Sequence, residues 1–340
     1  MNACHAVAAL TLLLVLAPAS AQNVKITPVG SHPGELCAND RAMIFEDPSG
    51  VRILYDVGQT VTGADDPRLG EIHVVLLSHA HGDHIGDQKL KALGAGDCAN
   101  SDRVPAGPNS MTAEVAAAKN AAIVMTSDMG SFVARKMQNI RGKPVGVCPQ
   151  TAGVTTVPVA ASCRSNTHLG GAFVAKSPDA TQGVEITIVY ASHANNVPHS
   201  LLSEALRATL APDDTSIVLG PPTGYVLKFT NGLTAYLSGD TGIHTEMKSV
   251  VNEFHKANLA VFNLGSSAAT VVSSAYAMNE LVRPASVVLT HTNEAVTEGG
   301  KLRPASRTAA VIKQLKPPAF LAISGRTMEF DGKGKCIAGC

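Results

Sequence analysis

Residues 74–86 read VVLLSHAHGDHIG, an apolar run typical of a buried strand that leads directly into a cluster of polar side chains. Three histidines and one aspartate lie within six residues, namely His79, His81, Asp83 and His84. His79 and His81 are two residues apart, so both can face one ion, while Asp83 and His84 can turn to a second. Imidazole and carboxylate groups are the ligands that Zn²⁺, Mn²⁺ and Fe ions take. A core would not tolerate four such groups without partners, so the stretch predicts a metal site.

The H-x-H-x-D-H pattern after an apolar strand resembles that of the metallo-β-lactamase-fold hydrolases. That family needs three further ligands from separate loops, and the chain offers one after each of three strand-like runs. ITIVYASH ends in His193, LTAYLSGDTG contains Asp240, and ASVVLTH ends in His291. The resemblance therefore covers most of the chain.

The resemblance implies a role for each candidate ligand. Two zinc ions per chain, with manganese or iron as alternatives, would share a hydroxide that attacks an electrophilic centre. Asp83 and Asp240 are the predicted catalytic residues, because Asp83 can orient the hydroxide and Asp240 can bridge the ions. The first ion would be held by His79, His81 and His193, the second by Asp83, His84 and His291, with Asp240 on both.

Some of these positions have alternatives. His199 follows His193 by six residues and His168 is a more distant rival, but His193 ends the strand-like run VEITIVYAS. Asp240 could be a turn aspartate, and His291 could begin a helix. Four side chains could contact a substrate or could be structural or exposed: His199, Asn195, Asn196 and Tyr225.

Two hairpin patterns indicate the fold. Strands at Arg41–Glu46 and Val51–Asp56 flank the turn signal Asp-Pro-Ser-Gly, and strands at Gly224–Thr230 and Leu233–Ser238 flank Asn-Gly. This faint internal repeat fits the αββα sandwich of the family, an α/β fold in which two mixed β-sheets are flanked by helices and the metals lie at the seam.

The rest of the chain alternates strands and helices, as α/β folds do. We predict helices at 113–119, 130–140, 246–255, 273–281 and 303–315, strands at 121–125, 153–159, 259–263, 286–290 and 319–323, and loops at 100–109 and 162–179.

Composition narrows the function classes. The 340 residues are 45% hydrophobic and 16% charged, with a formal net charge of zero and no tryptophan. No basic stripe or stacking platform indicates a nucleic-acid partner. We expect a small-molecule substrate, and the sequence leaves open whether the chain forms a homo-oligomer.

The N-terminus resembles an export signal. Residues 1–21 combine an apolar run, too short to span a bilayer, with a small-residue cleavage site that ends at Ala21. We expect a periplasmic or secreted protein, with one domain over residues 22–340 and no membrane span. An even number of cysteines then remains, which favours disulfides of undetermined connectivity: Cys37, Cys98, Cys148, Cys163, Cys336 and Cys340.

The branch of the family follows from the bridging position. Class B β-lactamases share the first motif but lack the bridging aspartate, and their usual second-site cysteine is missing here. GYVLKFTNGLTAYLSGDTG and YASH resemble the ascorbate-6-phosphate-lactonase-like branch instead. The predicted function is hydrolysis of a small-molecule ester, lactone or phosphodiester. The alternatives are a hydrolytic dehalogenase of an activated chloroaromatic, a β-lactam hydrolase, and a non-catalytic exported protein that binds metal or a partner.

Overall fold

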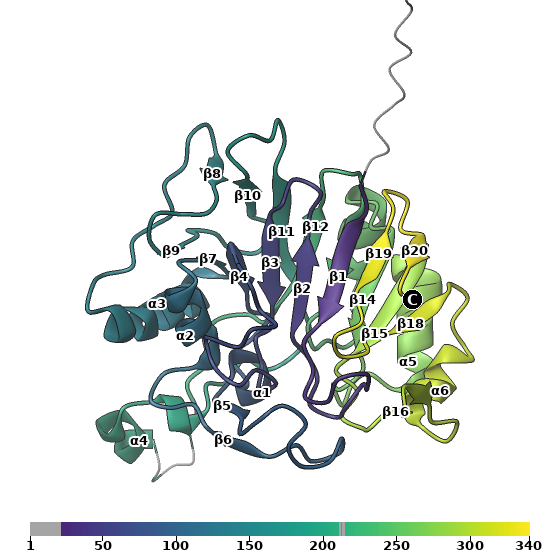
Figure 1. The fold of residues 1–340 in the computed structure, drawn as a ribbon, viewed down its shortest axis with the longest axis horizontal. Coiled ribbons are helices and arrows are strands. Elements are labelled where there is room, and N and C mark those ends of the chain that lie inside the picture. Colours follow the sequence, from purple (N-terminus) through teal and green to yellow (C-terminus); the bar gives the residue numbers. More distant parts are fainter. Residues whose placement is uncertain (1–21, 211, 213–214) are drawn as a thin grey trace, which may run out of the picture.

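Most strands of the chain assemble into two mixed β-sheets of eight strands each (Figure 1). The computed structural model describes residues 22–210, 212 and 215–340, so the predicted leader lies outside the described residues. In spatial order, sheet one contains β20 (Cys336–Ala338), β19 (Met328–Phe330), β1 (Val24–Pro28), β2 (Met43–Glu46), β3 (Arg52–Tyr55), β4 (Val74–Leu76), β7 (Ala122–Val124) and β9 (Cys163–Arg164). Sheet two contains β18 (Ala319–Leu321), β15 (Ser286–Thr290), β14 (Leu259–Asn263), β13 (Thr234–Leu237), β12 (Thr223–Lys228), β11 (Val184–Tyr190), β10 (Ala172–Lys176) and β8 (Val154–Thr156).

Helices cover the outer faces of both sheets, which confirms the predicted αββα sandwich. Figure 1 shows α2 and α3 at one side and α5 and α6 at the other. The helical segments are α1 (Gly82–Ile85), α2 (Met111–Ala118), α3 (Ser127–Arg141), the 3₁₀ turn η1 (His199–Leu201), α4 (Glu204–Leu210), the π-helix η3 (Met247–Phe254), α5 (Val271–Tyr276), the π-helix η4 (Ala277–Val282) and α6 (Arg307–Ile312). Two short hairpins, β5 (Gln88–Leu90) with β6 (Arg103–Pro105) and β16 (Thr297–Glu298) with β17 (Lys301–Leu302), lie outside the large sheets.

The two sheets share one internal pattern, which explains the faint sequence repeat. In sheet one the β2–β3 hairpin is followed by the parallel strands β4 and β7. In sheet two the β12–β13 hairpin is followed by the parallel strands β14 and β15. The Asp47 carboxylate in the first hairpin turn accepts a 2.8 Å bond from the backbone amide of Thr230 beside the second. Because the parallel strands of each sheet run the same way, the loops after them gather at one edge.

The inner faces of the sheets form the main hydrophobic core. Phe45 and Phe229 stack with ring centroids 6.3 Å apart, and Tyr55 meets Tyr225 edge to face at 6.1 Å. These aromatic pairs link the two sheets directly. Phe45 and Tyr55 come from sheet one, and Tyr225 and Phe229 come from β12 and the residue after it in sheet two.

Two predicted loops contain strands. Residues 162–179 include β10, which pairs with β8 and β11, and residues 100–109 include β6. Both strands are short runs between Gly and Pro signals, so their pairing is decided by neighbouring strands and not by local pattern. The predicted helices at 246–255 and 273–281 are present, but η3 and η4 are wound as π-helices.

All six cysteines of the described chain form disulfides, as the even count predicted. Cys37 pairs with Cys98, Cys148 with Cys163, and Cys336 with Cys340. The first fastens the β5–β6 segment to the loop before β2. Over the residues described, no helix is both long enough and apolar enough to cross a membrane.

Candidate metal centre

The structure brings all seven candidate ligands together at the edge where the strands end. His79 and His81 follow β4, and the short helix α1 after them carries Asp83 and His84. His193, Asp240 and His291 follow β11, β13 and β15. Three groups have ligand atoms within 4.8 Å of one another: His79 with His81 and His193, Asp83 with His84 and His291, and Asp240 with His79 and His84.

Asp240 lies between the first two groups. Its Oδ2 is 3.8 Å from Nε2 of His193. Its Oδ1 is 3.6 Å from Nε2 of His84 and 3.4 Å from Nε2 of His291. One carboxylate oxygen therefore faces each group, which is the arrangement a bridging ligand needs.

Several buried nitrogens of this cluster have no hydrogen-bond partner in the described chain. They are Nε2 of His84 and both ring nitrogens of His291. A Cβ at Gly265 would lie 1.6 Å from Nδ1 of His291, so only glycine leaves room for that ring. Buried polar atoms are normally paired. Here the unpaired ring nitrogens face carboxylate oxygens. Together they form a set of ligands that suits divalent metal ions such as zinc, manganese or iron.

The charges of the site favour the same conclusion. Burial, followed by the neighbouring His84, lowers the pKa of His79 well below its usual value, so its imidazole is neutral and can ligate. Burial alone would raise the pKa of Asp240, but His291 and His84 hold it well below the usual range. Burial likewise opposes a charge on His84, yet three carboxylates, Asp83 foremost, raise its pKa to about 10. Without a metal ion the carboxylates favour a proton on His84. A bound metal ion would take the place of that proton.

A second layer of side chains orients the histidines. The Asp56 carboxylate accepts a 2.7 Å bond from Nδ1 of His84, and it accepts 2.8 Å bonds from both the hydroxyl and the amide of Ser78. The Ser78 hydroxyl also lies 2.9 Å from Nδ1 of His79. Asp56 and Ser78 therefore turn one histidine of each group so that Nε2 faces the centre.

Sequence reasoning did not assign Asp56 or Ser78 to the site. The signal was present, because Asp56 ends the strand pattern RILYD much as Asp240 ends AYLSGD in the repeat. Asn263, which donates a 3.1 Å bond to Oδ1 of Asp240, was missed as well. These residues act through the ligands, so a search for ligand spacing passes over them.

Comparison with known proteins agrees with the fold. No family model matches the chain. A UPF0173 metal-dependent hydrolase of Cupriavidus taiwanensis is 23% identical over 226 residues, which are 66% of this chain and 60% of that protein. A second, from Koribacter versatilis, is 22% identical over 72% of this chain and 77% of its own length. The crystal structure of Igni18, a metallo hydrolase from Ignicoccus hospitalis, has a TM-score of 0.54 at 20% identity and covers 91% of this chain and 99% of its own.

The chain has the metallo-β-lactamase fold. The relatives are named only as metal-dependent hydrolases, so the ascorbate-6-phosphate-lactonase-like branch stays a prediction.

Within the metallo-β-lactamase fold, the structure gives the four substrate candidates different positions. Asn195 is buried, accepts a 2.6 Å bond from the amide of Ala80 and donates to the Leu219 carbonyl. Tyr225 is fully buried and donates a 2.7 Å bond to the Leu77 carbonyl. Both side chains thus brace the ligand loops from inside the fold. Asn196 is half-buried, and a substrate contact by this residue stays a prediction.

The rival histidines lie outside the cluster. His199 is exposed, with Nε2 3.1 Å from the Thr215 carbonyl. His168 is also exposed and bonds its neighbour's carbonyl. Neither belongs to the three ligand groups, whereas His193 does.

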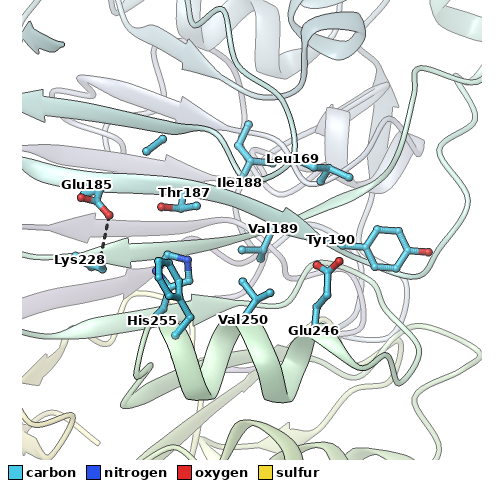
Figure 2. A pocket seen from close by; sticks show the side chains of 13 residues that line it. Leu169, Glu185, Thr187, Ile188, Val189, Tyr190, Lys228, Glu246, Val250 and His255 are labelled. Carbon is cyan, nitrogen blue, oxygen red and sulfur yellow. Dashed lines mark hydrogen bonds and ion pairs between the residues drawn. The ribbon is translucent and has the colours of Figure 1, made fainter.

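A cavity of about 590 Å³ lies elsewhere, on the outer face of sheet two (Figure 2). Thr187 and Val189 of β11 form one wall, and Val250 of η3 forms another. None of the seven ligand candidates lines this cavity, so it does not belong to the metal centre.

Proposed function

We propose that the protein is an exported hydrolase with two metal ions, most simply zinc, that cleaves a small-molecule ester, lactone or phosphodiester. The observation that carries the proposal is the position of Asp240, with one oxygen toward each group of histidines. The names of the metal-dependent hydrolase relatives support the reaction class.

The bound ions would supply an acidified water as nucleophile and a Lewis acid for the scissile group. The protein residues then have separate tasks. Asp240 would fix the separation of the two positions, and Asp56 and Ser78 hold Nδ1 of His84 and of His79, so that Nε2 of each histidine faces the centre. The Asp83 side chain is 33% exposed against 7% for Asp240, so Asp83 is the carboxylate of the cluster that would take a proton from the attacking water.

Other functions are less well supported. The usual second-site ligand of class B β-lactamases is a free cysteine, but all six cysteines of the described chain are in disulfides. A non-catalytic metal-binding protein would not need to keep all seven ligand candidates together. A hydrolytic dehalogenase would use the same centre, and only substrate testing separates it from an esterase.

A substrate screen tests the proposal. The zinc-loaded mature protein should hydrolyse at least one member of a panel of lactones, phosphodiesters, chromogenic esters, β-lactams and activated chloroaromatics, with Asp240→Ala as the inactive control. Two bound metals without turnover across the panel would favour the non-catalytic alternative.

Export makes a separate prediction. The periplasmic form should begin at Gln22 and should show no free thiol when it is unfolded without reductant, because its six cysteines are paired. N-terminal sequencing and thiol titration check both statements. An intact leader together with reactive thiols would contradict export.

A further inference from the structure

A buried arginine touches the metal centre from outside the ligand set. Arg41, just before β2, is 4% exposed. Its Nε and its Nη2 both lie 2.8 Å from the same oxygen, Oδ2 of Asp83. That oxygen is also 3.3 Å from Nε2 of His291. The guanidinium therefore bonds the Asp83 carboxylate through Oδ2, the oxygen that faces His291.

The same guanidinium also holds the loop that carries His291. Its Nη2 donates a 2.7 Å bond to Oδ1 of Asn293, whose Nδ2 donates a 2.9 Å bond to the Gly265 carbonyl. His291 and Asn293 both have left-handed backbones, with φ of 46° and 53°. Such conformations persist where surrounding contacts fix them. Arg41 thus links the loop after β15 to Gly265, the glycine that makes room for the His291 ring.

Three of the other ligands are held by different residues. Asp56 orients His84, Ser78 orients His79, and Asn263 bonds Asp240. The second group also contains Asp83 and His291, which Asp56 does not contact. Arg41 bonds both Asp83 and the loop that carries His291.

We propose that Arg41 is a positioning residue for the second metal position, formed by Asp83, His84 and His291. The inference rests on the proposed dinuclear function and deepens it. Arg41 sets the occupancy of the second position and leaves the first, formed by His79, His81 and His193, unaffected.

Two physical effects of Arg41 have opposite signs, so the proposal can be decided. Its positive charge repels a cation, and removal of that charge alone would tighten metal binding. Its forked hold keeps a one-third-exposed carboxylate from turning to solvent, and removal of that hold would weaken binding. Three carboxylates, Asp56, Asp83 and Asp240, surround the second position and offset one guanidinium, so the loss of the hold dominates.

Zinc titration of the metal-free protein against a chromophoric chelator measures the two affinities. In Arg41→Gln the weaker affinity should fall about 10- to 100-fold, the usual effect of losing a contact behind a ligand, while the tighter one stays unchanged. Arg41→Lys should recover only part of the loss, because an ammonium supplies a point charge without the fork.

Arg68→Gln is the matched control. Arg68 also bonds an aspartate, Asp66, and backbone carbonyls, but it touches none of the ligands. This variant should melt at a lower temperature and keep both zinc affinities.

The outcomes separate the claims. An unchanged or tighter second affinity in Arg41→Gln would overturn the proposal while the dinuclear function stands. Equal loss of both affinities together with a lower melting temperature would assign Arg41 a general structural role, which also overturns it. A wild-type protein that binds no zinc would refute the proposed function itself, and the Arg41 proposal with it.

Discussion

Asp240→Ala is expected to lower kcat/KM on the order of 10³-fold or more, because the metal-activated nucleophile is lost with its bridge. The Asp240 carboxylate is the group that faces both sets of histidines, and its Asn263 bond keeps it there. The fold should persist, since the apolar core between the sheets, with its Phe45–Phe229 pair, does not depend on the Asp240 carboxylate. Kinetics, metal content and melting temperature of the zinc-loaded variant measure these effects together.

His199→Ala provides the contrast. This histidine is exposed and bonds only a loop carbonyl, so metal content and melting temperature should match the wild type. If His199 touches substrate, KM alone should rise. Full activity with two metals in Asp240→Ala would refute the bridge, and loss of metal in His199→Ala would mean that the first group has been assigned wrongly.

Asp56→Asn is expected to weaken zinc binding at both positions about 10- to 100-fold. Asp56 accepts hydrogen bonds from His84 and from the Ser78 hydroxyl that orients His79, whereas an amide cannot accept all of them. A buried donor left without a partner also costs about 1–3 kcal/mol of stability. Zinc titration and thermal unfolding measure the two effects.

Asp66→Asn controls for the loss of a buried carboxylate. Asp66 is buried and bonds Arg68 and Thr62, away from the ligands. The Asp66→Asn variant should be less stable than the wild type and should bind zinc with unchanged affinity. Equal zinc affinities in Asp56→Asn and the wild type would show that Ser78 and the strand ends alone orient the histidines.

The ligand cluster could be predicted from the sequence because each set of ligands follows a strongly apolar strand. His79, His193, Asp240 and His291 follow runs that are buried on both faces, and such strands are recognisable locally. Strands β14 and β15 fall at the predicted residues for the same reason.

The contacts behind the ligands could not be predicted in the same way. Arg41 meets Asp83 and Asn293 across 42 and 252 residues of chain. Its local sequence only indicates a residue at the start of a strand. Nor does the pattern of β10, a short run in a Gly-rich segment, show that β8 and β11 would pair with it.

The metal content of the purified protein tests the central claim most directly. Protein prepared without chelator and examined by elemental analysis should carry close to two ions per chain, because six of the ligand candidates form two groups and Asp240 lies between them. A reproducible absence of bound metal, with no uptake after addition of zinc or manganese, would contradict the account.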